Sequence, residues 1–90
     1  MTFEWDERKR EANLVKHGVD FRRATALFES ETVEIVDDRR DYGETRINCL
    51  GAIAGQVYVV TYVWRGAVRR IISARRANAR ERKIYHESIA

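Results

Sequence analysis

Arginine is concentrated in one stretch of this 90-residue chain, between positions 65 and 83. The stretch holds eight basic residues and a single acid, Glu81. Arginine side chains keep their charge at cellular pH and bind phosphate oxygens through two parallel N–H groups. Dense arginine at the junction of an expected strand and helix therefore suits a phosphate-bearing partner. The same residues leave open the alternative of a solvated basic surface.

The chemistry that such a cluster supports is cleavage of RNA without a metal, in which the ribose 2′-OH attacks its own phosphate. The reaction needs a base for the 2′ proton, cations around the phosphate and an acid for the leaving 5′ oxygen. Arginine suits the second role but does not deprotonate. His17 is the first choice for proton transfer because its free pKa lies nearest neutrality, and Glu81 is the second. Glu81 also has a structural interpretation, since Asn78 three residues earlier makes a helix capping box with it.

The other candidate site residues are polar or aromatic side chains that could contact RNA. Three arginines are assigned to the scissile phosphate: Arg46, Arg70 and Arg75. With His17 and Glu81 they make up the candidate catalytic set. Those assigned to RNA binding are Lys9, Asn13, Lys16, Arg76, Tyr58 and Tyr62. Tyr58 and Tyr62 have an alternative role in the core because they lie on an expected central strand. Lys9, Asn13, Lys16 and His17 share one side of an expected helix, which is either a solvated face or a basic stripe facing RNA.

Charge is distributed unequally along the chain. Residues 1–44 hold 8 Lys and Arg against 12 Asp and Glu, a net of −4, whereas residues 45–90 hold 9 against 2, a net of +7. Such polarity favours oriented binding of a polyanion by the second half. The single cysteine, Cys49, excludes an internal disulfide, and no apolar run reaches the ~20 residues of a membrane span. We expect a cytoplasmic protein with no membrane association.

No metal or cofactor is expected. The acidic segment around Asp37, Asp38, Asp41 and Glu44 lacks calcium-loop spacing. The chain also lacks a glycine-rich phosphate loop and the spacing of a zinc site.

The elements that must position these side chains follow from local signals. Phe3-Glu4-Trp5 predicts a short strand, Asp6 caps a helix that ends near His17, and Gly18 stops it. Asp20 caps a second helix, whose core stripe is Phe21, Ala24, Leu27 and Phe28. The remaining elements are strands over 32–36, 46–53, 57–64 and 68–75, a polar loop over 37–43, and a final helix after Asn78 that turns Ile84, Tyr85 and Ile89 toward the core. The predicted fold is one α+β domain over residues 1–90, with two N-terminal helices, an antiparallel β-meander and a C-terminal helix.

The expected turns set a register for the meander. Two-residue turns at Ala54-Gly55 and Arg65-Gly66 pair residues whose numbers sum to 109 in the first long hairpin and to 131 in the second. This register places Arg46, Asn48, Thr61 and Arg70 on one face and Arg75 on the opposite face, and a single bulge would exchange the faces.

Several motifs coincide along the chain. Phe3-Glu4-Trp5-Asp6 leads through Lys9 and Asn13 to Lys16-His17-Gly18-Val19, followed by Phe21; Glu44 and Arg46 precede Gly51; and Arg70-Ile71-Ile72-Ser73-Ala74-Arg75 precedes Glu81-Arg82 and Tyr85. Over essentially its whole length, the chain resembles the BrnT family of toxins from bacterial type II toxin–antitoxin systems. It departs from the family at Arg76-Ala77-Asn78, where Lys-Ala-Thr is usual; both changes keep the charge and the capping oxygen.

The resemblance implies a RelE-like fold and ribonuclease activity that halts growth. It also implies a cognate DNA-binding antitoxin, BrnA-like with a ribbon-helix-helix domain, that neutralises the toxin, and possible homo-oligomers formed through that antitoxin. Two alternatives remain open from the residues: a non-enzymatic nucleic-acid-binding module, and a degenerate toxin that only binds its antitoxin.

Overall fold

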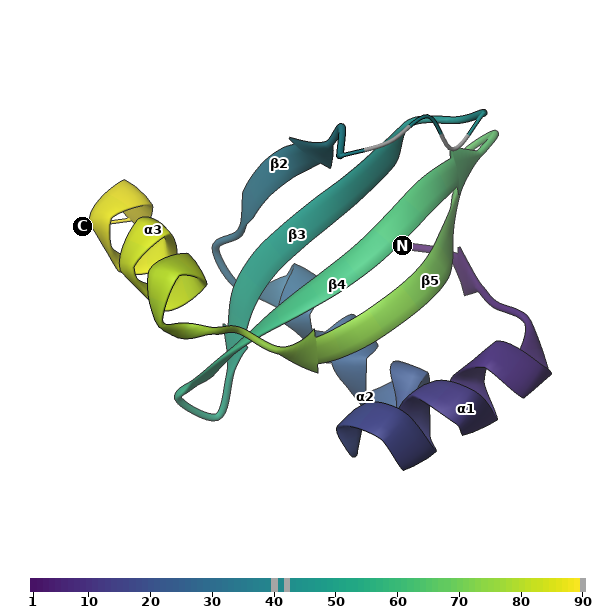
Figure 1. The fold of residues 1–90 in the computed structure, drawn as a ribbon, viewed down its shortest axis with the longest axis horizontal. Coiled ribbons are helices and arrows are strands. Elements are labelled where there is room, and N and C mark those ends of the chain that lie inside the picture. The colour runs from purple at the N-terminus through teal and green to yellow at the C-terminus, as the bar shows by residue number, and fades with distance from the viewer. Residues whose placement is uncertain (40, 42, 90) are drawn as a thin grey trace.

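The computed structural model describes residues 1–39, 41 and 43–89 and has the predicted α+β fold. Its strands are β1 (Phe3–Glu4), β2 (Val33–Asp37), β3 (Arg46–Ile53), β4 (Gln56–Arg65) and β5 (Val68–Arg76). Its helices are α1 (Glu7–His17), α2 (Phe21–Ala24) with the 3-10 turn η1 (Thr25–Glu29), and α3 (Ala79–Ile89). The sheet separates α3 from α1 and α2 (Figure 1). The polar loop predicted over 37–43 includes residues 40 and 42, which lie outside the described residues.

The predicted helix ends are confirmed. The Asp6 side chain accepts hydrogen bonds from the backbone N–H groups of Arg8 and Lys9, and Gly18 ends α1 with a φ of 71°. The Asp20 side chain accepts a hydrogen bond of 2.8 Å from the N–H of Arg22 and so caps α2. The second helix is shorter than predicted, because its backbone tightens into a 3-10 turn at Thr25.

The sheet order is β1-β5-β4-β3-β2, so β2 to β5 form the predicted antiparallel meander. β1 adds a parallel partner to β5, but only at Arg69 and Arg70. Beyond that point the amide of Asn13 from α1 takes the place of a strand. Its Nδ2 donates to the carbonyl of Ala74 at 2.7 Å, and its Oδ1 accepts from the N–H of Ala74 at 3.2 Å.

The register of β3 against β4 is the predicted one, with Ile47 opposite Tyr62. The register of β4 against β5 was predicted wrongly. Arg65 pairs with Val68, so the turn consists of Gly66 and Ala67; Gly66 has a φ of 59° at the position that a type II′ turn reserves for glycine. A bulge then interrupts the ladder, because Tyr62 pairs with Ile71 but Thr61 pairs with Ser73.

This bulge decides which face of the sheet the second half of β5 presents. Ile72 has no partner on β4, so alternation restarts one residue later at Ser73. Ser73 and Arg75 therefore lie on the face of Thr61 and Val59, opposite to the predicted assignment. Arg70, which precedes the bulge, lies opposite Val63 on that same face.

Two hydrophobic clusters cover the two faces of the sheet. The larger joins the predicted stripe Phe21, Ala24, Leu27 and Phe28 to residues of β3, β4 and β5. Gly51 permits this approach, because a Cβ there would lie 2.6 Å from Cγ of Leu27. The smaller cluster joins α3 to the sheet; its members are Leu50, Val57, Val59, Ala77 and Tyr85, with Val33, Ala52 and Ile89 packed against it. Asn48, Thr61 and Ser73 lie on the same face of the sheet but are not part of the smaller cluster.

Candidate active site

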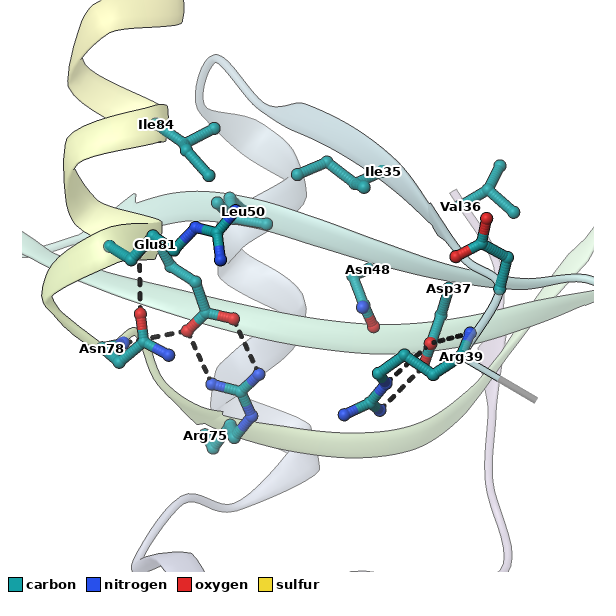
Figure 2. A pocket seen from close by; sticks show the side chains of 12 residues that line it. Ile35, Val36, Asp37, Arg39, Asn48, Leu50, Arg75, Asn78, Glu81 and Ile84 are labelled. Atoms are coloured by element: carbon teal, nitrogen blue, oxygen red, sulfur yellow. Dashed lines mark hydrogen bonds and ion pairs between the residues drawn. The ribbon is translucent and has the colours of Figure 1, made fainter.

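Arg75 and Glu81 are joined across the junction of β5 and α3. The two guanidinium nitrogens Nη1 and Nη2 of Arg75 donate to Oε1 and Oε2 of Glu81, each at 2.8 Å (Figure 2). This planar two-point geometry fixes the orientation of the guanidinium more firmly than a single contact. The pair is partly exposed, with 32% of the Arg75 side chain and 20% of the Glu81 side chain accessible.

Glu81 also closes the capping box predicted from the sequence. Its Oε1 accepts from the N–H of Asn78 at 2.9 Å, and its own N–H donates to Oδ1 of Asn78 at 2.8 Å. The cap and the ion pair therefore share one carboxylate. The hydrogen bond from Arg75 has the largest effect on the pKa of Glu81 and lowers it; burial opposes this effect, and the backbone hydrogen bond from Asn78 lowers the pKa further. Glu81 is consequently a carboxylate near neutral pH and is poorly suited to donate a proton.

A cavity of about 470 Å³ opens beside this pair, between α3 and the sheet. Figure 2 shows Ile84 on α3 facing Ile35 on β2, with Asn48 and Leu50 of β3 behind them. Glu81 points toward Arg75, and Val36 also lines the cavity. The other lining residues are Asp37, Asp38, Arg39, Arg75, Asn78 and Arg80. The guanidinium of Arg39 forms its own two-point pair with Asp37, with both bonds at 2.9 Å. The cavity is thus apolar toward α3 and β2 and rich in arginine at its charged rim.

Arg46 and Arg70 lie on the same face of the sheet as Arg75 but outside the cavity lining. Arg46 is opposite Asp37 on β2, and Arg70 is opposite both Val63 on β4 and Glu4 on β1. Nη1 of Arg70 donates to the Glu4 carboxylate. The sheet therefore brings the three predicted phosphate-binding arginines to one face, with Arg75 at the end of β5 that leads into α3 and the other two at the opposite end of the sheet.

His17 lies in a separate hollow of about 230 Å³ along the edge of β5, with Lys9, Lys16 and Ser73 in its lining. Burial lowers the pKa of His17 from its ordinary value of 6.5, and the charges of Lys16 and Arg75 lower it further. No described residue lines both hollows. Arg75 nonetheless connects them electrostatically, because it forms the ion pair in one and acts on the histidine in the other.

The structure places three of the predicted RNA-binding residues away from solvent. Asn13 is only 7% exposed and is used inside the fold, where its Nδ2 also donates to the carbonyl of Val19 at 2.9 Å. Tyr62 is fully buried and Tyr58 is 8% exposed, so both occupy the core position that was the alternative interpretation. Lys9, Lys16 and Arg76 are exposed.

Arg39 and Asn48 are polar cavity residues that are not among the candidates from the sequence. Arg39 stands among acidic residues whose sequence indicates a solvated loop. Asn48 was placed on the correct face by the β3–β4 register, but nothing in its local sequence distinguishes it from other strand residues. The hydrogen bond of 2.7 Å that it accepts from Oγ1 of Thr61 links positions 13 residues apart.

Among the residues that the structure describes, no three His, Cys, Asp or Glu side chains are grouped so that they could hold a metal ion. None of the described helices has the length and apolar composition needed to cross a membrane.

The fold and the cavity define a small α+β protein with an arginine-rich site at a strand–helix junction, a build suited to nucleic-acid phosphates. The chain belongs to the BrnT family: the sequence model of this family, described as the ribonuclease toxin BrnT of type II toxin-antitoxin systems, matches residues 5–81. The family resemblance drawn from the motifs is confirmed. Its RNA substrate and antitoxin partner follow from that membership. No curated protein matches the chain.

Proposed function

We propose that this toxin cleaves RNA without a metal, by attack of the ribose 2′-OH on the adjacent phosphate, at the face of the sheet that carries Arg75. The observation that carries the proposal is the two-point pair between Arg75 and Glu81 at the rim of an open cavity. Negative charge grows on the phosphate as the 2′ oxygen attacks. A guanidinium whose orientation Glu81 already fixes would stabilise this charge through its remaining N–H groups without reorganising during the reaction.

Arg75 is the proposed electrostatic catalyst and Glu81 its positioning residue. The lowered pKa of Glu81 keeps it ionised, so it holds Arg75 through both oxygens and is a poor proton donor. We therefore propose a positioning role for Glu81 in place of the proton transfer expected from the sequence. Arg46 and Arg70 would hold the phosphates that continue along the same face, away from α3.

His17 is the proposed base for the 2′ proton, and the 5′ oxygen takes up a proton from water as its bond to phosphorus breaks. A base must be neutral to act, and the lowered pKa of His17 favours the neutral imidazole at pH 7. Its neighbours Lys9 and Lys16 line the same hollow and would attract the RNA backbone. Exposed Arg76 extends this positive surface beyond the end of β5.

The proposed antitoxin would occlude this basic surface. A partner that covers arginines and lysines associates faster and pairs better when the contacting segment is acidic. We therefore expect the neighbouring gene to encode a small protein, BrnA-like with a ribbon-helix-helix DNA-binding domain, whose toxin-contacting part is acidic or amphipathic. The complex would act in the cytoplasm, and any homo-oligomer would form through the antitoxin. A stand-alone gene that is harmless on strong expression would count against this partner.

The proposal is tested by incubating antitoxin-free toxin with a synthetic RNA in EDTA and identifying the products. The expected products are a 2′,3′-cyclic phosphate and a free 5′-hydroxyl, with no cleavage where the nucleotide 5′ to the cut carries a 2′-deoxy or 2′-methoxy group. RNA binding without cleavage would favour a non-enzymatic module. Neither binding nor cleavage would favour a degenerate toxin that retains only antitoxin binding.

A further inference from the structure

The cavity beside Arg75 has the size and the walls of a site for one flat ring. Its volume of about 470 Å³ lies within the roughly 300–1,000 Å³ typical of small-ligand sites. Ile35 on β2 and Ile84 on α3 face one another across it, and Leu50 lies behind them (Figure 2). Ile35 is 39% exposed. Single-stranded RNA is recognised by bases that leave the stack, cover such surfaces and form hydrogen bonds through their edges.

Asn48 supplies an uncharged polar group to this cavity. Charged side chains attract any phosphate and carry little information about the base, whereas an amide can distinguish one base edge from another. Oγ1 of Thr61 donates to Oδ1 of Asn48 at 2.7 Å, and Thr61 is only 8% exposed. In this arrangement the oxygen end of the amide is the end that is already engaged.

The group left for a ligand is the Asn48 Nδ2, which has no hydrogen-bond partner among the described residues. An amide nitrogen only donates. It is satisfied by a carbonyl oxygen, such as O6 of guanine or O4 of uracil. Adenine and cytosine carry an amino group at the corresponding position, where two donors would face each other.

From this geometry we infer that the cavity takes the base next to the scissile phosphate and that Asn48 selects a keto base, guanine or uracil, over adenine and cytosine. The inference rests on the proposed function, because it assigns a base site to the same cleavage centre. Arg75 at the rim would hold the phosphate while the base enters between Ile35 and Ile84. Asn48 is a specificity-determining residue in this arrangement and takes no part in proton transfer.

The test maps cleavage of an RNA pool in which one position is randomised. We expect the wild type to favour G and U at one position beside the cut by about tenfold, the size of one good base contact. Asn48→Asp keeps the side-chain shape but replaces the donor with an acceptor, so the preference should reverse toward A and C. Thr61→Val releases the amide without changing charge and should erase the preference while cleavage continues.

The matched control is Gln56→Glu, which makes the same amide-to-acid change at the β3–β4 turn and should leave the base preference unaltered. An unchanged preference in Asn48→Asp and Thr61→Val, with cleavage retained, would overturn the inference. A wild-type preference for A and C would overturn it as well, because the oxygen of the amide would then face the base.

A second measurement separates this inference from the proposed cleavage reaction. The side-chain NH₂ signals of Asn48 are followed by NMR while the wild type is titrated with 3′-GMP, 3′-UMP, 3′-AMP and 3′-CMP in turn. Larger shifts with the keto nucleotides would support the base site even if the protein cut no RNA, which would itself refute the proposed function. No shift with any of the four nucleotides would overturn the base site, whatever the cleavage result.

Discussion

Glu81 holds Arg75 with both carboxylate oxygens while the first of those oxygens also caps α3 at Asn78. The orientation of the proposed catalytic arginine is thereby coupled to the start of the C-terminal helix. The sequence predicts the cap from a spacing of three residues. It does not predict the ion pair, which depends on the face that Arg75 occupies.

The first prediction concerns this coupling. Glu81→Gln should lower kcat by about tenfold or more, since Arg75 loses the partner that orients it. The pH dependence of kcat/KM should keep its shape, because Glu81 only positions Arg75. Loss of a titrating limb in the variant would instead make Glu81 a proton-transfer group.

The stability of Glu81→Gln should also depend on pH differently from that of the wild type. The pKa of Glu81 in the folded protein lies below its ordinary value of 4.5. Its ion pair therefore stabilises the fold fully above about pH 4.5 and loses this effect as the pH falls through the lower folded-state value. The difference in free energy of unfolding between wild type and Glu81→Gln should shrink below pH 4.5. Urea unfolding at several pH values measures it, and a difference independent of pH would contradict the assignment.

The second prediction concerns His17 as the base. Activity should fall with decreasing pH as the imidazole becomes protonated, at a pKa below 6.5. Lys16→Gln removes one of the positive charges that lower this pKa, so the acid limb should move to higher pH. NMR titration of the imidazole measures the same shift independently of activity. An imidazole pKa that is unchanged in Lys16→Gln would contradict the effect of Lys16 on His17. An unaltered rate in His17→Ala would remove His17 from the site.

The third prediction concerns the basic surface. Binding of an RNA with 2′-methoxy groups should weaken by about 20-fold between 50 and 200 mM salt if roughly three phosphates are neutralised, each contributing a slope near 0.7. Fluorescence anisotropy measures the dissociation constant. A dissociation constant that does not change with salt concentration would show that the unequal charge distribution of the chain has no role in RNA binding.

The fourth prediction concerns Asn13, which replaces a strand beside Ala74. Asn13→Ala leaves the N–H and carbonyl of Ala74 and the carbonyl of Val19 without their partner. The free energy of unfolding should fall by about 2–4 kcal/mol, the cost of burying such groups unpaired. Asn13→Asp keeps the acceptor but loses both donors, and should also be destabilised. Stability equal to that of the wild type, with weaker RNA binding, would restore Asn13 to the RNA surface.

The sequence was informative wherever the signal is local. Asp6, Gly18 and Asp20 mark helix ends through their own backbone and side-chain preferences, and Ala54-Gly55 sets the β3–β4 register. The bulge at Ile72 has no such signal, because it falls inside an apolar, β-branched run. Its effect is large, since it moves Arg75 to the face of Asn48, where both residues line the cavity.

The sequence also does not indicate which polar residues are buried. The Asn13 amide reaches a backbone 61 residues away, and the same helix exposes Val15, so an amphipathic reading of α1 places the wrong side inward. The fold class and most strand bounds were therefore predictable. Which residues come together in the site depends on contacts between distant parts of the chain, and these could not be predicted.

The central claim is that Arg75 stabilises charge that develops on the phosphate. The most direct measurement is the single-turnover cleavage rate of Arg75→Ala and Arg75→Lys in EDTA, at temperatures where each variant is as stable as the wild type. Lys83→Ala, which removes an exposed positive charge from α3, is the control and should cleave like the wild type. We expect Arg75→Ala to lose about 10²–10³ in rate with little change in RNA affinity. Arg75→Lys should recover only part of that rate, because an ammonium cannot contact two oxygens in one plane. A wild-type rate in Arg75→Ala, or a loss explained wholly by unfolding, would contradict the account.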